Sequence, residues 1–201
     1  MDNQKKIIPP YHKYNDKYYN RHFVQYRDWE NAIGKHIFET IKPSSILDLG
    51  CGVGSYLEGA LNAGCQRIYG IEISFEKAKK YITKDILPYI TYGDITENLI
   101  LNYKFDCVIS FEVAEHISPH KTTSFIKNLI KYSNKYIIIT AACPGQRGTG
   151  HINLREKEFW IKLIESYTFK YKEKLVEKFT KDWKSFSPPK YILQNLMVFK
   201  K

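Results

Sequence analysis

The chain has 201 residues, of which 43% are hydrophobic and 26% are charged, and its formal net charge is +10. This length suits one domain with a buried core, and the apolar content excludes a wholly disordered chain. No apolar run is long enough to cross a bilayer, and the first residues do not resemble a secretory signal. We therefore expect a soluble protein of a reducing, cytoplasmic compartment.

The charge and the cysteines give weaker indications. Nine lysines and three acidic residues lie between Lys170 and Lys201. This excess indicates either a nucleic-acid-binding surface or a biased base composition, and the lack of an arginine-rich cluster favours the second. The four cysteines have neither zinc-site spacing nor a disulfide framework. Nothing in the sequence fixes the oligomeric state.

The predicted elements alternate along the chain. Residues 1–20 are polar and rich in Tyr, and predict an irregular arm. Apolar residues at helical intervals predict a helix over 22–41, which Pro43 ends. Strands are then predicted at 45–49, 67–73, 90–92, 105–111 and 135–142, and helices at 55–63, 75–82, 119–132 and 153–167. Two last strands are predicted near 169–179 and 191–199.

Two helix starts carry sequence signals. Ser118 before Pro119 predicts an N-cap, and Asn153 with Glu156 has capping-box spacing. Near-continuous apolar strands separated by helices predict an α/β fold with a mostly parallel, Rossmann-like sheet covered on both faces. Such sheets bind ligands beyond the carboxyl ends of their strands, so the residues after each strand are the functional candidates.

Three signals follow the first three predicted strands. The segment from Asp48 to Gly54 reads DLGCGVG, whose alternate glycines allow a sharp turn and a close approach to a ligand. Glu72 ends the second strand and suits a pair of ribose hydroxyls. Asp94 follows the third strand and can accept a hydrogen bond from an exocyclic amino group. Taken alone, each acid is as consistent with a surface or loop-capping role as with ligand binding. Together, the three signals converge on one crevice.

With these segments, the sequence resembles the class I S-adenosylmethionine-dependent methyltransferases. The matching stretches are ILDLGCGVGSY, YGIEIS, YGDIT and FDCVISFEVAEHI, in this order over residues 45–145. The resemblance implies a seven-stranded sheet with a reversed last strand hairpin and S-adenosyl-L-methionine as cofactor. It also implies one methyltransferase domain over residues 1–201, with an arm and helix at 1–42 that cover the cofactor site.

The resemblance also implies roles for single residues. Asp48 would lie near the amino group of the cofactor, Glu72 would bind both ribose hydroxyls, and Asp94 would meet the adenine amino group. The other implied contacts are Gly50, Cys51, Gly52 and Gly54 at the methionine end, Ile73 and Ile95 on the adenine ring, and Phe111 and Glu112 at the near wall. A nicotinamide dehydrogenase is the rival interpretation, but its third glycine would fall at position 55, which is Ser55.

Methyl transfer also needs groups that serve the acceptor. In a helical turn, Glu112, Glu115 and His116 would share one face, and His151 follows in a glycine-rich loop. These four residues suit Mg²⁺ or another divalent cation, and His151, His116 and Glu112 are candidate bases for deprotonating a hydroxyl. The E-x-x-E-H turn is similar to metal-using O-methyltransferases, although many class I enzymes carry such residues without a metal.

The sequence does not identify the methyl acceptor. The stretch from Thr140 to Trp160 is similar to methyltransferases found among glycan-modifying genes, which favours a sugar or other small hydroxylated acceptor, with Arg147 as a candidate for an anionic group. RNA ribose 2′-O-methylation and an inactive cofactor-binding scaffold are the alternatives. Aromatic residues of the N-terminal segment could stack on an acceptor or anchor the arm: Tyr11, Tyr14, Tyr18, Tyr19, Tyr26 and Trp29.

Overall fold

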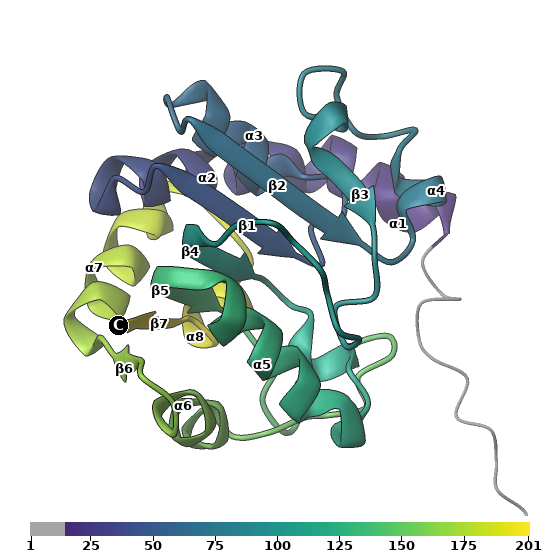
Figure 1. Cartoon of the computed structure of the whole chain (residues 1–201). Coiled ribbons are helices and arrows are strands. Elements are labelled where there is room, and N and C mark those ends of the chain that lie inside the picture. Colours follow the sequence, from purple (N-terminus) through teal and green to yellow (C-terminus); the bar gives the residue numbers. More distant parts are fainter. Residues whose placement is uncertain (1–14) are drawn as a thin grey trace, which may run out of the picture.

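The structure is a computed structural model that describes residues 15–201 (Figure 1). The expectations for Tyr11 and Tyr14, and for the first fourteen residues of the predicted arm, lie outside the described residues. Within the described part of the chain, none of the helices combines the length and the apolar composition that crossing a bilayer requires.

A seven-stranded sheet in the order β3-β2-β1-β4-β5-β7-β6 forms the centre of the molecule. Five strands pair in parallel, and β7 (Met197–Lys200) runs antiparallel between β5 and β6 (Lys170–Tyr171). This confirms the predicted Rossmann-like sheet with a reversed last strand hairpin. The parallel strands are β1 (Ser45–Leu49), β2 (Arg67–Glu72), β3 (Ile90–Tyr92), β4 (Phe105–Ser110) and β5 (Ser133–Ile139).

Helices cover both faces of the sheet because successive strand residues point to opposite faces. In β1, Ile46 belongs to one apolar cluster and Leu47 to the other. The first cluster includes side chains of α2 (Arg27–Ile41), α3 (Ser55–Asn62), α7 (Glu173–Trp183) and α8 (Lys190–Gln194), and the second includes side chains of α5 (Thr122–Tyr132) and α6 (Lys157–Glu165) (Figure 1). The fold thus has three layers.

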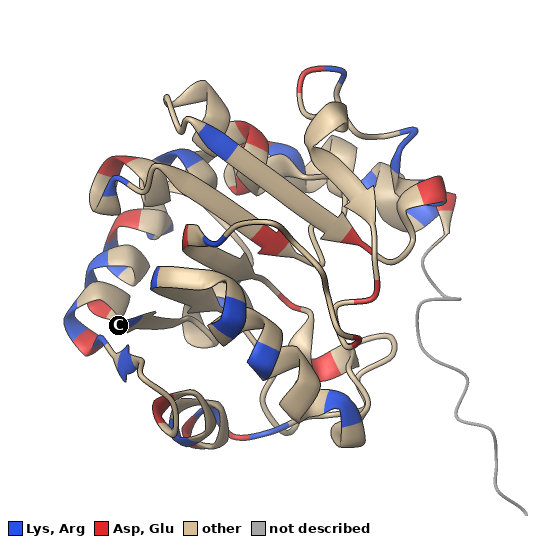
Figure 2. Cartoon of the chain, in the orientation of Figure 1, with Lys and Arg blue, Asp and Glu red and all other residues tan. Residues whose placement is uncertain are grey.

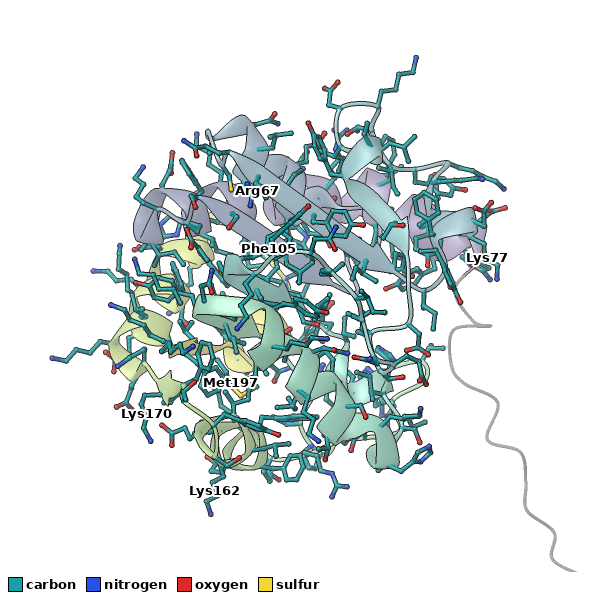
Figure 3. All side chains as sticks on the ribbon, viewed as in Figure 1. Arg67, Lys77, Phe105, Lys162, Lys170 and Met197 are labelled. Carbon is teal, nitrogen blue, oxygen red and sulfur yellow. The ribbon has the colours of Figure 1, made fainter. Side chains whose placement is uncertain are left out.

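The strand order reverses at β1, which has β2 on one side and β4 on the other. Arg67 and Phe105, labelled in Figure 3, are the first residues of β2 and β4 and mark the amino edge of the sheet. The carboxyl edge lies on the opposite side, toward α1 (Asp16–Arg21) (Figure 1). A ligand site is expected at this edge, beside the reversal of strand order.

The N-terminal segment is more regular than its composition predicts. Residues 16–20, predicted to be irregular, form most of α1, and a π-helical turn η2 (His22–Tyr26) joins α1 to α2. Asn15 caps α1 because its side-chain oxygen accepts the backbone N–H of Tyr18 at 3.1 Å. The prediction failed here because a run of Tyr and charged residues has little helical periodicity.

The strand predicted near 169–179 is wrong beyond its first residues. β6 ends at Tyr171, and α7 follows because Val176, Phe179 and Trp183 recur at helical spacing and bury one face. The strand predicted at 191–199 is partly wrong as well, since α8 occupies its first half and β7 its second.

Smaller differences concern helix ends. The helix predicted at 75–82 shortens to α4 (Phe75–Ala78). Ser118 makes no capping hydrogen bond, because its hydroxyl contacts Nδ1 of His120 at 2.9 Å. The capping box at Asn153 is also wrong, since α6 starts at Lys157 and the Asn153 amide instead donates to the Thr122 hydroxyl at 2.9 Å. That bond ties the loop before α6 to the start of α5.

Candidate active site

A cavity of about 690 Å³ opens at the carboxyl edge of the sheet. Its size is within the range of small-molecule and cofactor sites. The lining comes from the loops after β1, β2, β3, β4 and β5, from the segment 15–30, and from α8. The predicted site residues on its wall are Asp48, Gly50, Cys51, Gly52, Glu72, Ile73, Asp94, Ile95, Phe111, Glu112, Glu115, His116 and His151.

The glycine loop after β1 supplies backbone to this cavity. Gly52 has a φ of +56° and lines the cavity, and a Cβ there would point into open space. Gly54 differs from the prediction, since it is not part of the lining. A Cβ on Gly54 would lie 2.5 Å from Cδ1 of Ile90, so this glycine serves the packing of the loop at the start of α3.

Glu72 is fixed at the end of β2 by three hydrogen-bond donors. Its Oε2 accepts the Gly52 amide at 2.9 Å, and its Oε1 accepts the Ser74 amide at 2.8 Å and the Tyr19 hydroxyl at 3.1 Å. Burial raises the pKa of Glu72, while these donors favour the ionised form. The carboxylate is thus held at the cavity wall in one orientation, and its remaining lone-pair site can accept a hydroxyl of a ligand.

The other two acids that were predicted to bind the cofactor differ in their surroundings. Asp48 is buried at the end of β1, and its Oδ2 has no hydrogen-bond partner among the described residues. Burial, followed by the charges of Glu30 and Glu72, raises the pKa of Asp48 well above its ordinary value. Asp94 closes a turn after β3, where its Oδ1 accepts the amide of Thr96 at 2.8 Å and its hydroxyl at 2.7 Å. In Figure 2 the ends of β1 and β2 are marked by acidic residues at this edge.

A second group of polar side chains lies after β4 and β5. Glu115, His116 and His151 each offer one ligand atom, and these atoms all lie within 4.8 Å of one another. Glu112 is not part of this trio. The turn is a short 3₁₀ segment, Ala114–His116, and Glu112 precedes it with a φ of +53°, so these residues do not follow one helical face as predicted.

Two amides hold Glu112 in this uncommon backbone conformation. Gln146 donates to its Oε2 at 3.3 Å, and Asn195 donates to its Oε1 at 3.4 Å. Asn195 also donates to the Gln146 side chain at 2.9 Å. Burial raises the pKa of both Glu112 and Glu115, and the neighbouring charge of Glu112 raises the pKa of Glu115 further.

The trio satisfies several requirements of a divalent-cation site. Neither carboxylate oxygen of Glu115 has a well-aligned donor among the described residues, and the side chain is fully buried. Nδ1 of His116 contacts the Gly150 carbonyl at 3.1 Å, and Nδ1 of His151 contacts the Gln146 carbonyl at 3.2 Å. Because a carbonyl only accepts, Nδ1 carries the proton in both rings and Nε2 carries the lone pair. Backbone partners of this kind orient metal-ligating histidines.

The imidazoles are equally suited to a metal-free role. Burial lowers the pKa of His116 to about 4, so its ring is neutral at physiological pH. Nε2 of His151 lies 4.0 Å from Oε1 of Glu115. A neutral imidazole at a cavity wall can accept a proton from a hydroxyl.

Several lining residues escaped the sequence motifs. Tyr19 reaches Glu72 from α1, and Glu30 reaches the cavity from α2. Tyr191 of α8 lines the cavity too, and burial raises its pKa to about 12. No spacing between neighbouring residues in the sequence indicates that these residues line the cavity. The N-terminal aromatics were recognised as a group, but which of them reaches the site depends on how α1 and η2 fold back.

The sequence is similar to a known protein family and to curated proteins. A methyltransferase domain family matches residues 19–173. A tRNA U34 carboxymethyltransferase of Shewanella amazonensis is 26% identical over 159 residues, which cover 74% of this chain and 48% of that protein. The chain thus spans about half the length of the curated relatives it matches.

Solved structures share the fold at low identity. The plantazolicin methyltransferase BpumL, in complex with SAH, superposes with a TM-score of 0.59 at 18% identity, covering 92% of this chain and 87% of that chain. Magnesium protoporphyrin IX methyltransferase from Synechocystis, with bound SAH, gives a TM-score of 0.56 at 18% identity, covering 75% and 76%. With the family match over most of the sequence, these findings show that the chain belongs to the class I S-adenosylmethionine-dependent methyltransferases.

Proposed function

We propose that the protein transfers a methyl group from S-adenosyl-L-methionine to a hydroxyl group of a sugar or another small hydroxylated acceptor. The observation that carries this proposal is that one cavity holds both sets of groups. The cofactor-side acids Asp48, Glu72 and Asp94 and the acceptor-side trio of Glu115, His116 and His151 all line it. We further propose that the 201 residues form one methyltransferase domain, and that it works in the cytoplasm, where its four cysteines would stay free.

The chemistry divides between cofactor and protein. The sulfonium supplies an activated methyl group, which an acceptor oxygen displaces in line, so the protein must orient the oxygen and accept its proton. His151, His116 and Glu112 are the candidate proton acceptors. His116 is neutral at physiological pH, and Glu112 is oriented by two amides, so both can accept without a prior rearrangement.

A divalent cation would sit on Glu115, His116 and His151. Such an ion would favour the deprotonated form of a bound hydroxyl, and its positive charge would offset the negative charge of the ionised Glu115. The mixed donor set suits Mn²⁺ or Fe²⁺ better than Mg²⁺, which prefers oxygen ligands. Glu112, which was predicted as a fourth ligand, would lie beside the ion, and its position would be fixed by its hydrogen bonds with Gln146 and Asn195.

The proposal is tested by methyl transfer from labelled S-adenosyl-L-methionine to a panel of sugars, with Mn²⁺, with Mg²⁺ and with a chelator. We expect transfer to at least one hydroxylated acceptor. The variant His151→Ala should lose about 100-fold or more of this activity, in the range of a lost general base, whereas Lys35→Ala, on the exposed face of α2 and outside the cavity lining, should not. Full activity of His151→Ala would contradict its assigned role. A protein that binds the cofactor but methylates no acceptor would be the inactive scaffold.

The cation has a separate readout in thermal stability. A ligand that binds only the native protein raises the melting temperature, and a hundredfold excess over its Kd adds about 2.7 kcal/mol. We expect Mn²⁺ to stabilise the unmodified protein and to have no effect on Glu115→Gln. Equal stabilisation of both proteins would exclude the trio as the cation site.

RNA is the second candidate acceptor, as substrate of a ribose 2′-O-methyltransferase. The net charge of +10 and the names of the tRNA-modifying relatives favour it, and Lys17, Arg21 and Arg147 line the cavity without an ion-pair partner in the described part of the chain. Filter binding of tRNA at 50 and 200 mM salt tests it. Contacts to several phosphates predict an affinity that falls steeply between the two conditions, and no binding at 50 mM would exclude this candidate.

A further inference from the structure

Glu30 is a buried acid for which neither the sequence motifs nor the comparisons give a role. It lies in the first turn of α2, is only 4% exposed, and lines the cavity beside the glycine loop. We propose that Glu30 binds the α-ammonium group of the methionine part of S-adenosyl-L-methionine, together with Asp48. The inference rests on the proposed function and adds to it a cofactor-binding residue from the N-terminal segment.

The fold brings Glu30 close to Asp48 through an unusually close contact of two helices. A Cβ on Gly34 would lie 1.9 Å from the carbonyl oxygen of Tyr56, and a Cβ on Gly59 would lie 2.0 Å from that of Asn31. These glycines let α2 lie directly against α3, which begins immediately after the glycine loop. The first turn of α2 is therefore held near the loop, and Glu30 and Asp48 line the same cavity.

Neither Asp48 nor Glu30 forms an ion pair with a lysine or an arginine among the described residues. Asp48 has no ion-pair partner among the described residues, and Glu30 contacts only Nδ1 of His22, at 3.1 Å. Buried carboxylates that lie together without a cation are costly, so a positively charged ligand is expected between them. Glu58, a neighbouring acid of α3, shows the contrast. It is held by Arg27, Asn31 and Thr83 and needs no further partner.

The cofactor offers two positive groups, of which only one fits hydrogen-bond acceptors. The sulfonium has no N–H or O–H group, whereas the ammonium group has three donors. Oδ2 of Asp48 is buried and lacks a donor, and Glu30 has one oxygen paired with His22. One ammonium group can therefore donate to both carboxylates and neutralise part of their charge.

A purely structural role for Glu30 is the competing explanation. The contact with His22 fixes the π-helical turn η2 on α2 and would be sufficient reason for an acid here. The variant Glu30→Gln separates the two roles. Its amide oxygen can still accept a hydrogen bond from His22, while the negative charge that attracts an ammonium group is lost.

The test uses two ligands that share the nucleoside and differ in the amino-acid part. S-adenosylhomocysteine carries the ammonium group, and 5′-methylthioadenosine does not. Calorimetric titration should show that Glu30→Gln binds S-adenosylhomocysteine about tenfold more weakly, as expected for one lost charge-assisted hydrogen bond, and binds methylthioadenosine with unchanged affinity. The matched control Glu39→Gln, an exposed acid of the same helix, should change neither affinity.

Unchanged affinity of Glu30→Gln for S-adenosylhomocysteine would overturn the inference, and so would an equal loss for both ligands. If this variant does not fold, Glu30→Asp keeps the charge and shortens the side chain. It should then weaken S-adenosylhomocysteine selectively, and no selectivity would again overturn the role. Failure of the unmodified protein to bind either nucleoside would instead contradict the proposed function itself.

Discussion

The two sides of the cavity are built from the chain in different ways. The cofactor side takes Asp48, Glu72 and Asp94 from the ends of three neighbouring strands that follow one another in sequence. The acceptor side combines Glu112 after β4, His151 in the loop after β5, and Asn195 before β7. The first arrangement follows from strand order alone, whereas the second depends on how distant segments meet.

The two sides also differ in how their acids are satisfied. Glu72 and Asp94 accept several hydrogen bonds from nearby backbone and side chains. Neither carboxylate oxygen of Glu115 has a hydrogen-bond partner in the described structure, and burial raises the pKa of this group well above its ordinary value. Glu72 and Asp94 are thus preorganised, whereas Asp48 on the cofactor side and Glu115 on the acceptor side each have a buried oxygen without a partner among the described residues. Variants that affect one side without the other test this difference.

The largest effect is expected at the helix contact that positions the first turn of α2 beside the glycine loop. Gly34→Ala would force its Cβ to within 1.9 Å of the Tyr56 carbonyl, so α2 must move away from α3. Helix propensity favours Ala over Gly by about 1 kcal/mol, but overpacking at a helix contact costs about 1–3 kcal/mol or more. We expect a net loss of stability in urea unfolding. The exposed Lys35→Ala should be neutral, and a more stable Gly34→Ala would show that the helices do not meet closely.

A smaller and more selective effect is expected at Gly148. A Cβ there would lie 2.1 Å from Nε2 of His151, so Gly148→Ala must displace this side chain rather than the backbone. We expect a loss of methyl-transfer activity of about 10-fold or more with unchanged affinity for S-adenosylhomocysteine, because a displaced catalytic group affects the chemical step. If Gly148→Ala instead weakened cofactor binding and left turnover normal, the acceptor side and the cofactor side would not be independent of each other.

The smallest effect concerns the stability of the ligand-free protein. Burial raises the pKa of Asp48 above its unfolded value, so ionisation of this group destabilises the native state as pH rises above about 4. Asp48→Asn should therefore be more stable than the unmodified protein at pH 7, by about 1 kcal/mol or more, and the gain should vanish below pH 4. It should also bind S-adenosylhomocysteine more weakly. Thermal melts across pH would contradict this account if Asp48→Asn lost stability at pH 7.

The sequence predicted the sheet, and it predicted that Asp48 and Glu72 lie together at one edge of it, because both features depend on local signals. Apolar strands and the glycine loop around Gly52 determine where Asp48 and Glu72 lie. It failed for α7, where a strand was predicted although Val176 and Phe179 recur at helical spacing and bury one helix face. It also could not identify Glu30, whose role depends on a close helix contact that no spacing reveals.

On the acceptor side, the sequence indicated which residues come together but did not predict how they are arranged. His151 does meet Glu115 and His116, but Glu112 turns away into a different network. The reason is a backbone conformation with positive φ, which amides of Gln146 and Asn195 support from distant segments. Such long-range support cannot be inferred from a four-residue spacing.

The most direct test of the central claim is a calorimetric titration with S-adenosylhomocysteine of the unmodified protein and of Glu72→Ala. Glu72 is fixed by three donors at the cavity wall and is assigned to the ribose hydroxyls. We expect binding by the unmodified protein and a loss of about 100-fold in the variant, in the range for a lost charged hydrogen-bond partner. No binding by the folded, unmodified protein, or equal binding by both, would contradict the account.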